Sequence, residues 1–190
     1  CSDIDEIDAS HLITSNVKNM LNMFSSCTSL TSLDISNFNT EKVTSMNGMF
    51  YYCSNLKHLY ITNFITSSVT DMGWMFCGCY SLESLDITNF NTKNVRYMKN
   101  MFGNCYSLTT LDLTHFDTSL VTDMSYMFYY CKKLDSIDIS HFNTTSTKEF
   151  DYMFYGCKSL KSLDVTKFNT AIALNMTNMF GFCTSLTNLD

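Results

Sequence analysis

The sequence predicts an α/β solenoid of seven coils, with a parallel sheet along one side and short helices along the other. The first observation behind this fold class is a period of 26 residues that runs through the chain without an insertion. Its most regular column holds Leu33, Leu59, Leu85, Leu111, Ile137, Leu163 and Leu189. The second observation is that each period contains a strand-like pattern followed by a helix-like one. A fixed period of this length is typical of solenoids, in which each repeat packs on the next.

Each repeat starts with a predicted strand, which is clearest at residues 30–38. Leu30, Leu33, Ile35 and Phe38 follow the spacing L-x-x-L-x-L-x-x-F, which is close to a leucine-rich-repeat pattern. Around Leu33 the apolar and polar residues alternate with period two, so the polar ones are expected on the opposite face of the strand. Stacked strands of this kind predict a continuous parallel sheet joined by right-handed crossovers.

A turn and a predicted helix follow the strand. Val43, Met46, Met49, Phe50 and Cys53 are spaced so that a helix would place them in one buried stripe. A threonine precedes this segment in every copy, which suits a helix cap or a turn hydrogen bond. The column holds Thr14, Thr40, Thr66, Thr92, Thr118, Thr144 and Thr170.

Eight of the nine cysteines form another column, and only Cys77 lies outside it. The column holds Cys1, Cys27, Cys53, Cys79, Cys105, Cys131, Cys157 and Cys183. Free cysteine is often fully buried, so we expect a stack of unreactive thiols, with labelling of at most Cys1 and Cys77. Zinc is disfavoured, because ligands 26 residues apart lack local C-x-x-C pairing and no histidine column accompanies them. We therefore expect no metal.

The repeat reads L-D-[ILV]-[ST]-x-F-[ND]-T-x-x-V-x-x-M-x-x-M-F-x-x-C-x-x-L, most cleanly over residues 85–105. This string resembles the 26-residue repeat of the BspA-like surface leucine-rich-repeat proteins, known from bacterial surface proteins and from protists. The resemblance covers essentially the whole chain. It implies a leucine-rich solenoid and, for the family, cell-surface display, adhesion and binding to a host or matrix. It implies neither catalytic residues nor cofactors.

The repeat leaves no place for a domain boundary. We expect one leucine-rich-repeat solenoid domain over residues 1–190, a slice of a longer array without caps, because both ends fall inside repeats. A formal net charge of −6 without a basic stripe disfavours nucleic acid, and the lack of a run of 18 apolar residues disfavours membrane insertion of this segment. An enzyme is not expected, because no nucleophile with a base and no phosphate-binding loop is found.

One polar column is a candidate for ligand binding. It holds Asp34, Tyr60, Asp86, Asp112, Asp138 and Asp164. Neighbouring carboxylates about 5 Å apart repel each other, so stability alone would not favour such a row. The row predicts an acidic surface that binds a cation, a basic peptide or a ligand rich in hydroxyls. The alternative is a solvated strand face that keeps the chain soluble and prevents wrong pairing.

The predicted helix side is unusually aromatic on its outer positions. A possible partner surface there holds Tyr126, Tyr129, Tyr130, Tyr152 and Tyr155, and similar outward positions hold Tyr51, Tyr52, Trp74, Tyr97 and Phe182. Aromatic patches often mark partner or sugar surfaces, although tyrosine is also common at half-exposed positions. The histidines are expected to be ordinary surface residues.

These observations lead to two hypotheses on function. The first is a non-enzymatic binding or adhesion module, extracellular at a cell surface, whose partner is a protein or a glycan. The second is a structural protein whose array assembles by self-association into a filament or coat. Neither hypothesis requires a cofactor.

Overall fold

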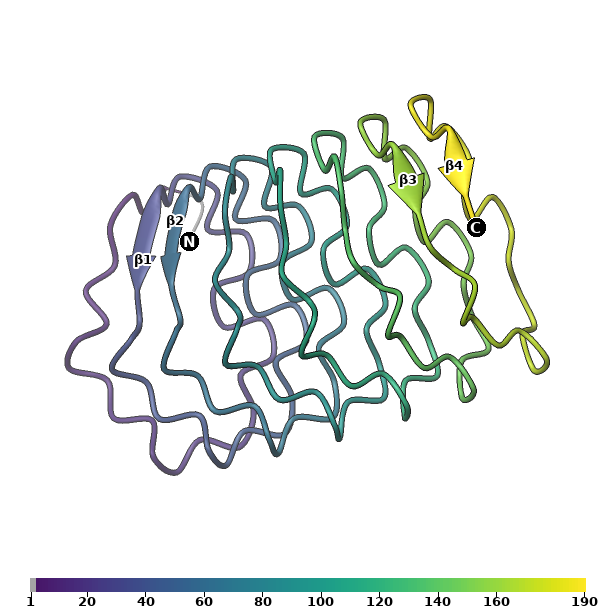
Figure 1. The fold of residues 1–190 in the computed structure, drawn as a ribbon. Helices are drawn as coiled ribbons and strands as arrows, with labels where there is room; N and C mark the ends of the chain where they lie inside the picture. The colour runs from purple at the N-terminus through teal and green to yellow at the C-terminus, as the bar shows by residue number, and fades with distance from the viewer. Residues whose placement is uncertain (1–2) are drawn as a thin grey trace.

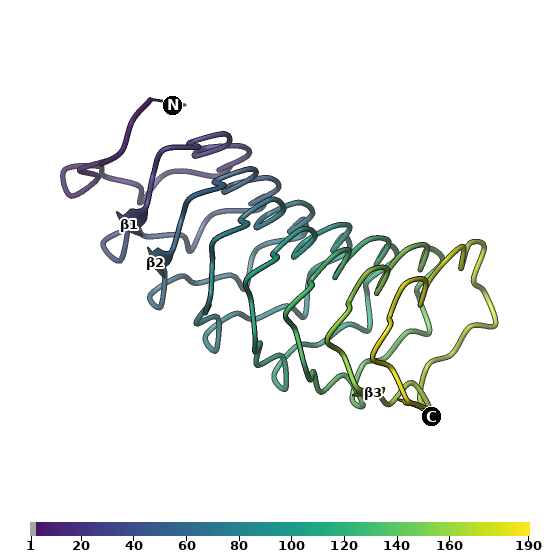
Figure 2. The same cartoon turned by 90° about the horizontal axis from the view of Figure 1, so that it is seen from above.

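The computed structural model describes residues 3–190 as one stack of similar coils (Figure 1). Seen from above, the coils follow one another in a row from the N-terminal to the C-terminal end (Figure 2). Parallel bridges connect residues 26 positions apart, in a column of Asn19, Ser45, Asp71, Tyr97, Asp123, Glu149 and Asn175. The 26-residue repeat is therefore the structural unit, as predicted.

The predicted helices do not form, so the α/β class is wrong. No helix is present within residues 3–190, and residues 43–53 form a series of turns. Two positions in this segment, those of Gly48 and Tyr52, have left-handed backbones with φ of 60° and 57°. The same two columns are left-handed in the other coils that the structure describes. A left-handed residue cannot continue a right-handed helix, so each coil is interrupted twice.

Hydrogen bonds between coils replace those of a helix. The backbone N–H groups of Met46, Gly48 and Phe50 donate to carbonyl oxygens of the next coil at 2.9–3.0 Å. Intervening N–H groups donate three residues back within the same coil, as from Met49 to Met46 at 3.1 Å. Apolar side chains at spacings of three and four residues fit this succession of tight turns as well as they fit a helix. None of the described residues therefore forms a helix long and apolar enough to cross a membrane.

The strands are shorter than predicted and do not form a continuous sheet. Strand β1 (Ser32–Asp34) pairs in parallel with β2 (His58–Tyr60), and β3 (Ser162–Leu163) pairs with β4 (Asn188–Leu189). Figure 1 shows these two pairs near opposite ends of the stack. Both pairs have the predicted 26-residue register, with Leu33 opposite Leu59 in the first. The ladder that runs through the stack instead follows the turn segment.

The core consists of stacked columns of identical side chains. Phenylalanine rings of successive coils stack with centroids 5.3–5.9 Å apart and nearly parallel planes, in a column from Phe24 to Phe180. Methionines from Met46 to Met153 fill the neighbouring columns and are buried. In the last coil, Leu174 and Met176 are exposed. The predicted core residues are thus confirmed for the inner coils.

The threonine column connects each coil to the next. The Thr40 hydroxyl donates to the Ile65 carbonyl at 2.9 Å and accepts from the Ile65 N–H at 2.8 Å. Thr92 makes the same pair of bonds to Asp117. These hydroxyls therefore bond across coils, and the turn hydrogen bond and the helix cap expected from the sequence are both wrong, because the partners lie 25 residues away and no helix follows within residues 3–190.

The cysteine column is buried between Cys27 and Cys157, and its thiols are free. From Cys53 onward, each thiol of the column donates to a carbonyl of the preceding coil, as Cys53 Sγ does to Phe24 O at 3.0 Å. Burial raises the pKa of Cys53 to about 12. Cys77 is also buried, and Cys1, the other thiol that the sequence left open to labelling, lies outside the described residues.

Candidate functional site

The predicted acidic column lies on the outer face of the segment that precedes each turn. All its members are exposed: Asp34, Tyr60, Asp86, Asp112, Asp138 and Asp164. Asp34 ends strand β1, and Tyr60 ends strand β2 with its ring half exposed. The other members occupy the equivalent position in successive coils, so the structure brings the column together as the sequence predicts.

The carboxylates of this column also hold the backbone. Asp112 Oδ1 accepts from the Thr114 N–H at 3.0 Å and from its hydroxyl at 2.7 Å. Asp138 makes the same two bonds with Ser140. The N–H and the hydroxyl of Thr114 both lower the pKa of Asp112, because they stabilise its charged form. Each aspartate therefore closes a turn, a structural role that charge repulsion alone did not reveal.

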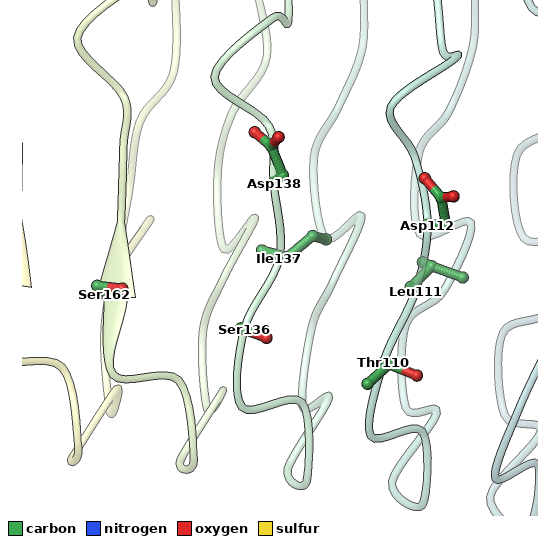
Figure 3. Close-up of a pocket in the computed structure, with 7 residues that line it drawn as sticks. All are labelled: Thr110, Leu111, Asp112, Ser136, Ile137, Asp138 and Ser162. Carbon is green, nitrogen blue, oxygen red and sulfur yellow. The ribbon is translucent and has the colours of Figure 1, made fainter.

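A shallow groove lies between the coils that carry Asp112 and Asp138 (Figure 3). Its volume is about 430 Å³, and Leu111 and Ile137 lie between the acidic and the hydroxyl-bearing residues along the two coils. The hydroxyl-bearing residues are Thr110, Ser136 and Ser162. Because only Oδ1 of each carboxylate is used by its turn, Oδ2 can still accept a hydrogen bond from a ligand. The groove could thus take a cation or a hydroxyl group.

Aromatic side chains gather on the outer face of the turn segment, and we name this surface the aromatic ridge. It consists of Tyr51, Tyr52, Trp74, Tyr80, Tyr106, Tyr126, Tyr129, Tyr130, Tyr152, Tyr155 and Phe182. The five tyrosines predicted as a partner surface form its densest part, with ring centroids 4.6–6.2 Å apart. All five are half-buried.

A lysine joins the two halves of the ridge. Tyr80 and Tyr106 stack with centroids 4.7 Å apart in the N-terminal half. The Lys132 Nζ atom lies 3.8 Å from the Tyr106 ring centroid and 5.5 Å from that of Tyr130, in the C-terminal half. An ammonium group over a ring face is attracted by the negative face of the ring. The ridge is therefore one continuous surface over several coils.

Many ridge residues occupy backbone positions that suit them poorly. Of the fourteen left-handed residues that the structure describes, six are aromatic: Tyr52, Trp74, Tyr126, Tyr130, Tyr152 and Phe182. Elsewhere these columns hold glycine or asparagine, as at Gly48, Gly78, Asn100 and Asn178, with serine once at Ser26. A bulky residue in this conformation costs roughly 1–3 kcal/mol, whereas glycine avoids that strain. Backbone stability alone would not select aromatic residues here.

Part of the ridge was not predicted from the sequence. Tyr80, Tyr106 and Lys132 share one column with Ser54, so the 26-residue spacing could have revealed them. Tyr97 lies in the column of bridges, beside a depression of about 280 Å³ that Trp74 also lines.

The histidine expectation also needs correction. His115 and His141 share one column and are half-buried, and His115 Nε2 lies 2.9 Å from the Ile87 carbonyl oxygen. Asparagine serves this position in earlier coils, where Asn63 Nδ2 donates to the Ser36 carbonyl at 3.0 Å. His115 is therefore part of the packing between coils.

The comparison with protein families gives a match over most of the chain. Residues 18–112 and 104–190 match the family described as "Mycoplasma protein of unknown function, DUF285". The chain belongs to this family. This family match confirms the resemblance to BspA-like surface repeats that was noted from the sequence.

The comparisons with solved structures and with curated proteins give less information. A crystal structure of a leucine rich cell surface protein from Faecalibacterium prausnitzii A2-165 is similar to this DUF285 chain, with 19% identity and a TM-score of 0.37. The similarity covers 92% of this chain and 69% of that one. No curated protein matches the chain.

Proposed function

We propose that this DUF285 chain is a non-enzymatic binding module displayed at a cell surface, which uses the aromatic ridge to adhere to a protein or a glycan. The observation that carries the proposal is the presence of aromatic residues at left-handed positions where asparagine or glycine fits better. Strained residues that persist against stability are concentrated at functional sites. The resemblance of the repeat to BspA-like proteins supports surface display.

The chemistry of the ridge favours binding. Its rings are held by one another, so little side-chain freedom would be lost when a partner covers them. Tyrosine and tryptophan combine a large apolar face with a polar group, and they dominate the energetics of many interfaces. The interior columns, in contrast, repeat nearly the same residue types from coil to coil, and their side chains are packed against one another. A recognition function therefore has to use the outward columns.

The test removes rings without disturbing the fold. Tyr126→Asn with Tyr152→Asn places in this column the residue that already stands at positions 100 and 178. Labelled protein is applied to immobilised glycans, to extracellular-matrix proteins and to cultured epithelial cells. We expect the double variant to bind at least about tenfold more weakly than the wild type, since two interface aromatics together contribute more than about 1.4 kcal/mol.

The matched control is Asp112→Asn with Asp138→Asn. Asparagine Oδ1 can still close both turns, so only two charges in the groove are lost. We expect this variant to bind like the wild type. If it loses binding while the tyrosine variant keeps it, the recognition surface is the acidic groove and the ridge proposal is wrong. If the wild type binds no surface in the panel, the binding function itself is contradicted.

A further inference from the structure

A group of lysines borders the C-terminal half of the aromatic ridge. We name this group the basic edge; it consists of Lys132, Lys133, Lys158 and Lys161. These four are a third of the twelve lysine and arginine residues in a chain whose net charge is −6. The charge at this place is therefore opposite to that of the molecule as a whole.

The repeat places the basic edge next to the rings. Lys132 and Lys158 lie in one column on neighbouring coils, two residues after Tyr130 and Gly156. The Lys161 N–H donates to the Asp135 carbonyl at 3.4 Å, so these two residues also lie side by side on neighbouring coils. Lys133, Lys158 and Lys161 are exposed, and within residues 3–190 none of them forms an ion pair. Asp135 is the one carboxylate residue within 129–135 and 155–161, so a positive charge remains for a partner.

We propose that the ridge and the basic edge together bind an anionic polysaccharide, namely a glycan with a uronate carboxylate on successive sugars. This inference rests on the proposed binding function of the ridge and names its ligand class. The C–H face of a pyranose ring is apolar and suits an aromatic ring, while the sugar hydroxyls remain in water. A uronate carboxylate accepts charge-assisted hydrogen bonds from a lysine ammonium. The ridge and the edge supply these two contacts side by side, over several coils.

The charge of the molecule favours a glycan over nucleic acid. Duplex DNA carries a negative charge about every 1.7 Å, and its binding depends on many phosphate contacts to basic residues. A chain with net charge −6 and only four lysines at this edge would repel such a polymer beyond the contact. A polyuronate has at most one charge for each sugar, and its apolar ring faces can contribute the remaining affinity. The observations therefore favour the glycan.

The experiment compares two oligosaccharides of equal length with the intact chain. One is an oligouronate with a carboxylate on every sugar, and the other is a neutral cello-oligosaccharide. We expect the oligouronate to bind more tightly, and more weakly as salt rises. Lys133→Gln with Lys158→Gln removes two exposed charges, and neither lysine has a cation–π contact within residues 3–190. We expect this variant to bind the oligouronate about 3- to 10-fold more weakly and with less salt dependence.

A matched control removes charge elsewhere. Lys18→Gln with Lys42→Gln deletes two exposed lysines from the first coils, far from the basic edge along the stack, and should leave oligouronate binding unchanged. If neutral glycans or matrix proteins bind through the ridge and the oligouronate does not, the binding function stands and the anionic ligand is wrong. The same conclusion follows if both lysine pairs weaken binding equally, because that result indicates non-specific attraction. Tighter binding of single-stranded DNA than of the oligouronate would also overturn the inference.

Discussion

Single side chains replace many of the hydrogen bonds that helices and sheets would otherwise supply. At the corners of the coils, aspartate and asparagine close turns, as Asn91 Oδ1 does by accepting from the Lys93 N–H at 3.2 Å. Between coils, the buried threonines hold both the N–H and the carbonyl of one residue in the next coil. A threonine is suited to this because one hydroxyl can donate and accept at the same time. The recurrence of these residue types therefore has a physical cause.

Thr92→Val tests this role at one residue. Valine keeps the shape but removes the hydroxyl, so the N–H and the carbonyl of Asp117 each lose a partner. Each of these part-buried hydrogen bonds contributes about 0.5–1.5 kcal/mol, so we expect a loss of about 1–3 kcal/mol in the free energy of unfolding. The thermal midpoint should fall by roughly 2–12 °C for a chain of this length. Calorimetry provides the measurement.

Thr170→Val is the matched control. Thr170 occupies the same column but is exposed, and its hydroxyl has no partner in the described part of the chain. Its replacement should change the midpoint by less than the error of replicate scans. Equal effects of the two substitutions would show that the column acts through packing alone.

At the scale of the element, the turn segment shows what sequence reasoning could and could not reach. The 26-residue phase, the buried columns and the register of β1 with β2 were predictable, because side-chain spacing determines them. The local backbone conformation of the turn segment was not predictable. Apolar residues at Met46, Met49, Phe50 and Cys53 fit both a helix and a succession of three-residue turns. Left-handed residues decide between the two, and at Tyr52 the residue type gives no sign of that conformation.

The candidate site shows the same division. The five tyrosines from 126 to 155 were predicted to face outward, and the structure brings them together. The acidic column was correctly located, yet the bonds that Asp112 accepts from Thr114 were missed because they depend on a turn two residues long. The 26-residue period predicts which side chains point outward, but it does not predict which hydrogen bonds they form.

Circular dichroism tests the conformation of the turn segment. A solenoid with one short helix in each coil would give distinct minima near 208 and 222 nm, as helical proteins do. The structure has no helix within residues 3–190, so we expect no such pair of minima in the native protein. Trifluoroethanol provides a positive control, since it induces helix in many chains. A strong helical spectrum in plain buffer would contradict the fold described above.

At the scale of the whole molecule, the interior holds a buried thiol of the cysteine column in coil after coil. Burial raises the pKa of Cys53, Cys77 and Cys131 to about 12, and it also raises those of Cys79, Cys105 and Cys157. Desolvation is the main cause, because a thiolate loses its hydration in the apolar interior. The core can therefore hold these thiols only in their neutral form.

This column predicts that the protein loses stability steeply in alkali. An unfolded thiol ionises near its ordinary pKa of 9.0, whereas the folded Cys53 keeps its proton until about pH 12. The unfolded state therefore releases protons first, and the free energy of unfolding falls as pH rises from 9 to 12. Each buried thiol contributes about 1.4 kcal/mol per pH unit to this fall, and its full stabilisation is present below pH 9.

Urea unfolding under reducing conditions at a series of pH values gives the slope, to which the tyrosines also contribute. Cys131→Ala isolates the thiol part, because it should make the slope shallower by about 1.4 kcal/mol per pH unit. An unchanged slope in that variant, or rapid labelling of native Cys131 by iodoacetamide, would show that the column is open to water and that its burial does not govern the alkaline limit.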